Sequence, residues 1–292
     1  MKRTLIALVF ATLAAFAANA EEKTKTYEFK NITGIEAGYT YDIHVTQGKS
    51  DVVTVVYEST YEDYMTVHFS ERTGVLRLGM EEIPKRLIKE KGQSIKVYLD
   101  MKLVLGIDLS GAASITFEGS FNTSELEIEL SGASKLNDLN VKGISLTGDF
   151  SGASYAYIEG TFTDDVDLEV SGASKVTFNG KSSMMEGDFS GAARFEGDIY
   201  ADKCDIECSG AANARMEGAA KTMEIDGSGA CSINAKDFVA DKVNISLSGA
   251  CNAKVHATKI LMHDISRTCK MTYYGDAELQ NMGEDPNIVK GR

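Results

Sequence analysis

The amino-acid sequence predicts an all-β fold, namely a parallel β-helix (solenoid) with about nine coils of 18–21 residues each. Two observations predict it. The five residues before each Ser-Gly-Ala tripeptide alternate between apolar and polar side chains, which indicates a half-buried strand. The tripeptide recurs every 19–21 residues, and such a repeat indicates a solenoid whose units bury apolar faces against each other. The eight serines are Ser110, Ser131, Ser151, Ser171, Ser190, Ser209, Ser228 and Ser248, and a degraded ninth copy begins at Ser266.

The first element in chain order is a predicted signal peptide at residues 1–20. Lys2 and Arg3 precede an apolar run from residue 5 to 16, and Ala18-Asn19-Ala20 provides a cleavage site. The apolar run is too short to span a bilayer, and no other stretch approaches twenty apolar residues. We therefore expect an exported, extracytoplasmic protein, periplasmic or secreted, without a transmembrane segment.

Residues 21–104 form a second predicted unit, which is rich in strands but lacks the tripeptide. Alternating or β-branched runs occupy residues 40–46, 52–57, 75–78 and 94–99. Because the open end of a solenoid needs cover, we expect irregular initial turns or a capping β unit here. Residues 81–92 are a charged excursion, either a loop or a helical turn.

The repeats proper occupy residues 105–275, followed by a tail or cap at 276–292. After each tripeptide comes a second short strand, as in Lys-Val-Thr-Phe at 175–178, and usually another glycine. Two columns of each coil should point inward. The residues immediately before the serine are Leu109, Leu130, Phe150, Val170, Phe189, Cys208, Gly227, Leu247 and Ile265. The residues five before the serine are Leu105, Leu126, Leu146, Val166, Met185, Cys204, Met223, Val243 and Leu261.

These features resemble a known family. The Ser-Gly-Ala-Ser repeats, the strands before them, Phe-Lys-Asn-Ile-Thr-Gly-Ile at 29–35 and Tyr-Tyr-Gly at 273–275 are similar to the secreted bacterial proteins described as "putative auto-transporter adhesin, head GIN domain". That family is common in Bacteroidetes and its function is not defined. The resemblance covers residues 28–276 and implies a right-handed parallel β-helix, an extracytoplasmic setting and no catalytic residues.

Acidic side chains form two outward columns on the strand before the tripeptide. Since stacked strands lie about 4.8 Å apart, neighbouring carboxylates repel by about 0.9 kcal/mol per pair in bulk water. A functional interpretation is a weak Ca²⁺-binding strip at Asp188, Glu207 and Asp226, because Ca²⁺ prefers carboxylate oxygens. The alternative is a solvated face that keeps the rod soluble. The columns are Asp108, Glu129, Asp149, Glu169, Asp188, Glu207, Asp226 and Asp264, and Glu127, Asp167, Glu186, Asp205 and Glu224.

The strand after the tripeptide carries a mixed polar column. Tyr155 and Tyr157 on it are candidates for stacking against a sugar ring, although exposed tyrosines are also ordinary strand residues. The column consists of Ser114, Lys135, Tyr155, Lys175, Arg194, Asn213, Ser232, Asn252 and Lys270.

Five cysteines and four histidines complete the candidates. Cys231, Cys251 and Cys269 each follow a serine by three residues and should stack on consecutive coils, either as buried thiols or with a Cys231–Cys251 bridge. Thiols on one line do not surround a zinc ion tetrahedrally. His263 occupies a column of isoleucine and leucine, which favours a packing role.

The net charge of −13 makes nucleic acid an unlikely partner. Acid and base groups are not clustered on one face; the repeat is interrupted by Gly148, Gly187 and Gly227 instead. We therefore expect a non-enzymatic β-helix, an adhesin or binding scaffold that presents flat faces to a surface glycan or envelope protein, without a cofactor other than weakly bound Ca²⁺. The alternatives are a structural or envelope-maintenance protein and, less favoured, a carbohydrate-active enzyme.

Overall fold

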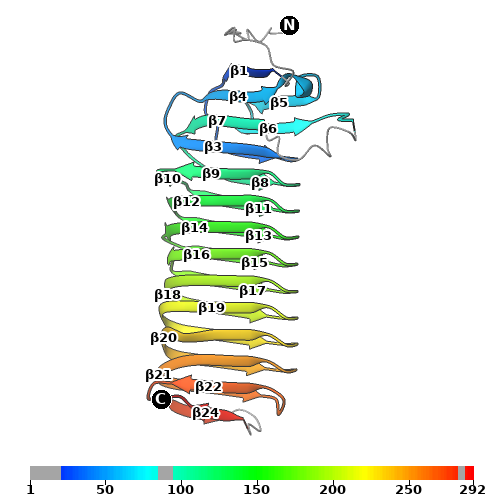
Figure 1. The fold of residues 1–292 in the computed structure, drawn as a ribbon. Helices are drawn as coiled ribbons and strands as arrows, with labels where there is room; N and C mark the ends of the chain where they lie inside the picture. The colour runs from blue at the N-terminus through cyan, green and yellow to red at the C-terminus, as the bar shows by residue number, and fades with distance from the viewer. Residues whose placement is uncertain (1–20, 85–94, 282–286) are drawn as a thin grey trace.

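A computed structural model describes residues 21–84, 95–281 and 287–292. The strands stack as the rungs of a rod, with β1 near one end and β24 at the other (Figure 1). The predicted signal peptide and residues 85–92 of the charged excursion lie outside the described residues. No helix in the described ranges is long and apolar enough to cross a membrane.

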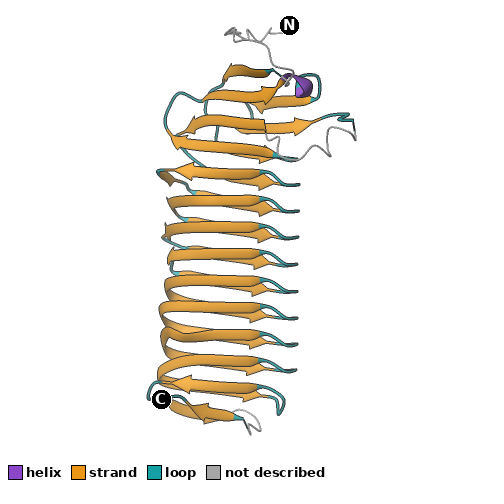
Figure 2. Cartoon of the chain, viewed as in Figure 1, coloured by secondary structure: helices purple, strands orange, loops and turns teal. Residues whose placement is uncertain are grey.

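Each coil consists of one strand, a corner made by the tripeptide, and a second strand (Figure 2). From β18 onward, the second strand of one coil runs without a break into the first strand of the next. The strands are β8 (Gly106–Leu109), β9 (Ser114–Glu118), β10 (Ser120–Asn122), β11 (Glu125–Leu130), β12 (Lys135–Gly143), β13 (Ser145–Phe150), β14 (Tyr155–Phe162), β15 (Asp165–Val170), β16 (Lys175–Lys181), β17 (Met184–Phe189), β18 (Arg194–Cys208), β19 (Asn213–Gly227), β20 (Ser232–Leu247), β21 (Asn252–Ile265) and β22 (Lys270–Tyr274).

Equivalent strands of successive coils pair in parallel, and their register is continuous except for local shifts between β12 and β14, β19 and β20, and β20 and β21. Phe150 on β13 faces Val170 on β15, and the amide of Ser171 donates to the Phe150 carbonyl at 2.8 Å. Ser151 and Ser171 are therefore vertical neighbours. The prediction of an all-β parallel solenoid of about nine turns is confirmed.

The strands form two long ladders. The strands before the corners make the ladder we call the acidic sheet, which comprises β8, β11, β13, β15, β17 and the carboxyl-terminal halves of β18–β21. The strands after the corners make the mixed sheet, which comprises β9, β12, β14, β16, the amino-terminal halves of β18–β21, and β22. Their apolar side chains meet in one continuous core between the two ladders.

The inward columns are buried as predicted, with one exception. Leu105 is only half-buried, whereas Val104 is fully buried. The reason is that β8 begins at Gly106, so Leu105 still belongs to the preceding connection, where its amide donates to the Thr33 carbonyl at 2.7 Å.

The glycine interruptions have a packing cause. A Cβ atom on Gly187 would lie 2.6 Å from the ring of Phe189, and one on Gly148 would lie equally close to the ring of Phe150. The phenyl rings thus fill the space that a side chain at these inward positions would need. At Gly227 the Sγ atoms of Cys231 and Cys251 and a methyl group of Leu247 border the same space.

The corners depend on the left-handed conformation of the tripeptide glycine. Gly152 and Gly172 have φ values of 74° and 69°, a region that residues with a Cβ atom reach only at a cost. The corners also stack so tightly that a Cβ atom on Gly172 would lie 2.6 Å from the Gly152 carbonyl oxygen. The degraded copy at Ser266 forms a turn as well, although Arg267 and Thr268 replace the glycine and alanine.

Part of the segment before the repeats is itself a coil of the solenoid. β2 and β3 pair in parallel with β8 and β9, and Ala37 faces Leu109. Tyr39 therefore stands where Gly111 stands in the next coil, and it adopts the same left-handed conformation with φ 58°. A further rung from β6 and β7 covers the other side of this coil. The strands are β2 (Gly34–Ala37), β3 (Tyr41–Gln47), β6 (Val75–Met80) and β7 (Ile95–Met101).

Antiparallel strands close this end of the rod, because β1 pairs with β4, β4 with β7, and β5 with β6. A single turn of 3₁₀ helix, η1 (Ser59–Tyr61), follows β4. At the opposite end, β23 and β24 pair in parallel with β21 and β22, so part of the tail continues the stack. These strands are β1 (Glu22–Glu28), β4 (Val52–Glu58), β5 (Met65–Ser70), β23 (Glu278–Asn281) and β24 (Ile288–Lys290).

Candidate functional site

The outer face of the acidic sheet carries a ladder of carboxylates, which Ser246 interrupts near the carboxyl-terminal end. Period two in the strands places them outward, and the parallel register places each beside its equivalent one coil away. The β2–β3 coil adds Glu36, which faces Asp108. The ladder runs in spatial order through Glu36, Asp108, Glu129, Asp149, Glu169, Asp188, Glu207 and Asp226, and after Ser246 it ends at Asp264.

Most carboxylates of this ladder form no ion pair with a basic side chain of the described residues. Within the described residues, Glu36 pairs with Arg77, and Asp205 of the second acidic column accepts from Lys203 at 3.3 Å. The mutual repulsion favours the protonated form of the carboxyl groups and so raises their pKa. Asp188, burial and Asp226 raise the pKa of Glu207, and Asp149, burial and Asp188 raise the pKa of Glu169.

The acidic sheet predicts an unusual pH dependence. A carboxyl group with a raised pKa binds protons more readily in the folded than in the unfolded state, so its contribution to the free energy of unfolding falls as the pH rises above about 4. We therefore expect the melting temperature at low ionic strength to rise as the pH falls from about 7 to about 5.

Carboxyl groups with a lowered pKa have the opposite effect, and they set the lowest pH down to which the melting temperature should rise. Hydrogen bonds from Lys23 and Lys25 lower the pKa of Glu62 to about 2, so the stabilisation from Glu62 is lost only as the pH falls below its ordinary range. Thermal melts from pH 7 to 3 test the expectation, and about 0.5 M salt should flatten the rise because it screens the repulsion. A melting temperature that climbs from pH 5 to 7 at low salt would contradict it.

The three residues predicted as a Ca²⁺ strip lie along one shallow groove of about 600 Å³. Asp188, Glu207 and Asp226 line it together with the corner serines of the same coils. Phe189, Cys208 and Leu247 form an apolar floor. The structure thus brings the three carboxylates into one row. No group of three or more His, Cys, Asp and Glu side chains in the described residues is arranged to hold a metal ion.

The mixed sheet differs because it carries basic as well as acidic side chains, some of which form ion pairs. Lys175 lies 3.0 Å from Glu196, and Arg215 lies 2.9 Å from Glu217. The predicted polar column is in register, with Tyr155 facing Lys175. The rod therefore presents one predominantly acidic face and one face on which charges of both signs alternate.

Two tyrosines predicted as sugar platforms are partly enclosed. Tyr155 and Tyr157 are both half-buried, and the hydroxyl of Tyr157 donates to the Glu159 carboxylate at 2.7 Å. Sequence reasoning missed Tyr200, which is 48% exposed on the same sheet. The signal was available, because Tyr200 faces Lys181 on one side and only Ala219 on the other in the repeat alignment.

A trough of about 310 Å³ runs beside Tyr200 across four coils. A second hollow of about 350 Å³ adjoins it, and both are lined by Asn179 and Asp198. One column of planar polar side chains follows the trough from coil to coil. Its members in register are Asn140, Glu159, Asn179, Asp198 and Glu217.

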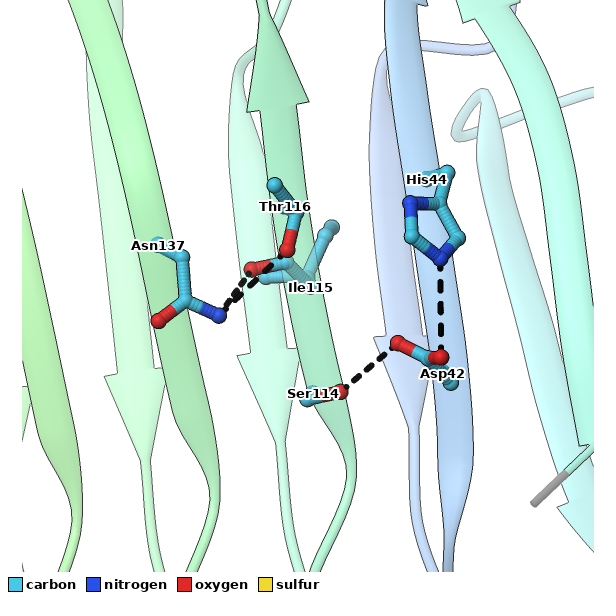
Figure 3. A network of polar contacts seen from close by, with 6 residues as sticks. All are labelled: Asp42, His44, Ser114, Ile115, Thr116 and Asn137. Carbon is cyan, nitrogen blue, oxygen red and sulfur yellow. Dashed lines mark hydrogen bonds and ion pairs between the residues drawn. The ribbon is translucent and has the colours of Figure 1, made fainter.

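A serine, an aspartate and a histidine come together on β3 and β9 (Figure 3). Ser114 Oγ donates to Asp42 at 3.0 Å, and His44 Nε2 lies 3.5 Å from the same carboxylate. A nucleophilic triad requires the histidine between the serine and the acid so that it can take the serine proton. Here the aspartate lies in the middle, so this order of residues does not activate the serine.

The cysteines are buried free thiols, as the packing interpretation predicts. Burial raises the pKa of Cys208 to about 12 and also raises the pKa of Cys231, so neither is a reactive thiolate at neutral pH. Cys231, Cys251 and Cys269 continue inward positions that Ser134, Ser154 and Ser174 occupy in earlier coils. His263 is buried and faces Ile245, as predicted.

Fold and surface together define an elongated β-solenoid repeat protein with extended, solvent-facing columns. The family model described as "Putative auto-transporter adhesin, head GIN domain" matches residues 31–180 and 162–277. The chain belongs to this family, which confirms the resemblance drawn from the sequence. A search of curated proteins found no match.

Comparison with solved structures gives matches at low sequence identity, and the first one reported shares the fold. A "putative adhesin" from Parabacteroides merdae is 17% identical, with a TM-score of 0.51 and coverage of 94% of this chain and 98% of that one. A "putative adhesin" from Parabacteroides distasonis is 17% identical, with a TM-score of 0.49 and coverage of 93% and 97%. A "Putative lipid binding protein" from the same species is 18% identical, with a TM-score of 0.48 and coverage of 94% and 98%.

Proposed function

We propose that this protein is a non-enzymatic, extracytoplasmic binding scaffold that presents its flat faces to a surface glycan or an envelope protein. The observation that carries the proposal is the regularity of the outer faces, where exposed side chains repeat from coil to coil without a long insertion. The acidic sheet keeps its register throughout, and the mixed sheet shifts only locally, between β12 and β14, β19 and β20, and β20 and β21. Such faces suit an extended partner that makes many similar contacts. The family description as an adhesin supports the same class of function.

Localisation and binding can be tested separately. Cell fractionation followed by detection of the chain should place it outside the cytoplasm, as the sequence of residues 1–20 predicts. The purified chain should then bind members of a glycan array or an envelope-protein array. An exported chain that binds neither kind of array, yet is needed for envelope integrity, would favour the structural alternative.

We also propose that Asp188, Glu207 and Asp226 attract Ca²⁺ weakly along the groove of the acidic sheet. Their exposed carboxylates stack in register and lack a basic partner among the described residues, so a divalent cation would relieve their repulsion.

Millimolar Ca²⁺ is therefore expected to raise the melting temperature more than NaCl of equal ionic strength does. A triple variant with Asp188→Asn, Glu207→Gln and Asp226→Asn should lose most of this difference. A melting temperature that Ca²⁺ leaves unchanged would count against the strip.

A further inference from the structure

We propose that the trough beside Tyr200 on the mixed sheet binds a neutral oligosaccharide whose chain runs along the rod. The inference rests on the proposed binding function and adds the place and the ligand class. Tyr200, Asp198 and Asn179 are its central residues. They lie on β18 and β16, in the middle of the rod, where the coils are in strict register.

The ring of Tyr200 supplies an apolar platform. It is one of few large apolar side chains that the described surface leaves exposed. Lys181 Nζ lies 5.6 Å from the ring centroid on one side, whereas the neighbour on the other side is Ala219, which has no side chain beyond Cβ. One face of the ring is therefore left open, and the apolar C–H face of a sugar can pack against such a ring.

Planar polar side chains beside the ring supply hydrogen bonds. The backbone N–H of Asp198 donates to Asn179 Oδ1 at 3.1 Å. This hydrogen bond holds the side-chain amide of Asn179 in the lining of the trough. Asp198 itself is exposed, and its carboxylate makes no hydrogen bond or ion pair within the described residues. Carboxylates and amides in this setting can accept from and donate to sugar hydroxyls.

The repeat sets the direction of the ligand. Asn140, Glu159, Asn179, Asp198 and Glu217 follow one another at one residue per coil, about 4.8 Å apart. A ligand lying along the column meets one such side chain after another. A chain of similar sugar units, each with hydroxyl groups at a regular interval, has the matching periodicity.

The charges around the trough favour a neutral ligand. Lys142 and Lys181 lie along it together with Glu159 and Asp198, so neither charge sign dominates. An anionic glycan would in addition approach a chain of net charge −13. A cationic ligand would instead prefer the acidic sheet, which lacks neutralising partners.

The test uses the full exported chain and three variants. Binding is measured on an array of neutral, anionic and cationic oligosaccharides, and the tightest neutral ligand is then titrated by calorimetry. Tyr200→Ala and Asp198→Ala should each weaken its binding by at least about tenfold, without lowering the melting temperature. Tyr98→Ala is the matched control, because Tyr98 is similarly exposed on the same ladder but lies on β7, far from the trough.

The outcomes separate this inference from the proposed function. Neutral-glycan binding that survives Tyr200→Ala and Asp198→Ala would overturn the trough and leave the scaffold function intact. Binding only to charged glycans or to envelope proteins would do the same. A chain that binds nothing on either array would overturn both. Loss of binding in Tyr98→Ala as well would show that the effect is not specific to the trough and would also overturn it.

Discussion

Replacing Phe189 with alanine is expected to lower the free energy of unfolding by about 3–5 kcal/mol. Phe189 is 1% exposed, and its ring stacks on that of Phe195 with the centroids 4.5 Å apart. Alanine would remove the buried ring and the aromatic contact, and Gly187 beneath it offers no side chain to fill the cavity. Chemical denaturation followed by circular dichroism measures the change.

Asp188 provides the control for this substitution. It directly precedes Phe189 on β17 but points outward, into the ladder of mutually repelling carboxylates. Asp188→Ala should therefore leave stability nearly unchanged or raise it slightly at neutral pH and low salt, because it removes one carboxylate from between Glu169 and Glu207. Equal losses in the two variants would refute the assignment of inward and outward positions.

Replacing Gly172 with alanine is expected to destabilise the protein by at least about 2 kcal/mol. The left-handed conformation alone costs a residue with a Cβ atom about 1–2 kcal/mol. In addition, the new methyl group would clash with the backbone of Gly152 in the preceding coil. That backbone is held in its corner and cannot move aside as a flexible side chain could.

Gly106→Ala is the matched control for the corner. Gly106 has no atom within 4 Å of the position of an added Cβ, and its φ is not in the left-handed region. The control variant should therefore stay within about 0.5 kcal/mol of the unmodified chain. Comparable losses at Gly106 and Gly172 would show that the stacked corners contribute no special constraint.

Much of the solenoid could be predicted because one local signal repeats. The tripeptide marks eight corners, and the alternation before it sets which side chains face inward, so the pairing of Ser151 with Ser171 follows from spacing alone. The acidic ladder follows from the same register. These features depend on neighbouring coils only, which is why a single sequence contains them.

The sequence predicted irregular initial turns or a cap before residue 105, and it did not single out β2 and β3 as a regular coil because Gly38-Tyr39-Thr40 stands in place of the tripeptide. A signal existed in Ile35-Glu36-Ala37, which aligns with Ile107-Asp108-Leu109. The strand pairing of the antiparallel cap could not be predicted, because the pairing of β1 with β4 is set by packing between segments that are distant in sequence.

The trough beside Tyr200 could not be predicted for a related reason. Gly160 and Gly180 line it, and the space that a side chain would need at these positions is bordered by the rings of Phe162 and Phe178. Only the assembled core determines it. The outward direction of Tyr200 could be derived from the repeat, whereas the hollow next to it could not.

The order of the rungs differs from the order of the chain at the capped end. The coil of β2 and β3 lies between the rung of β6 and β7 and the coil of β8 and β9, although it precedes both in sequence. Its strands therefore acquire partners on both sides only after residues 75–118 have been synthesised. We expect the rod to fold by adding coils from this capped end toward the C-terminus. Each newly synthesised coil then has one exposed strand edge with which it can pair.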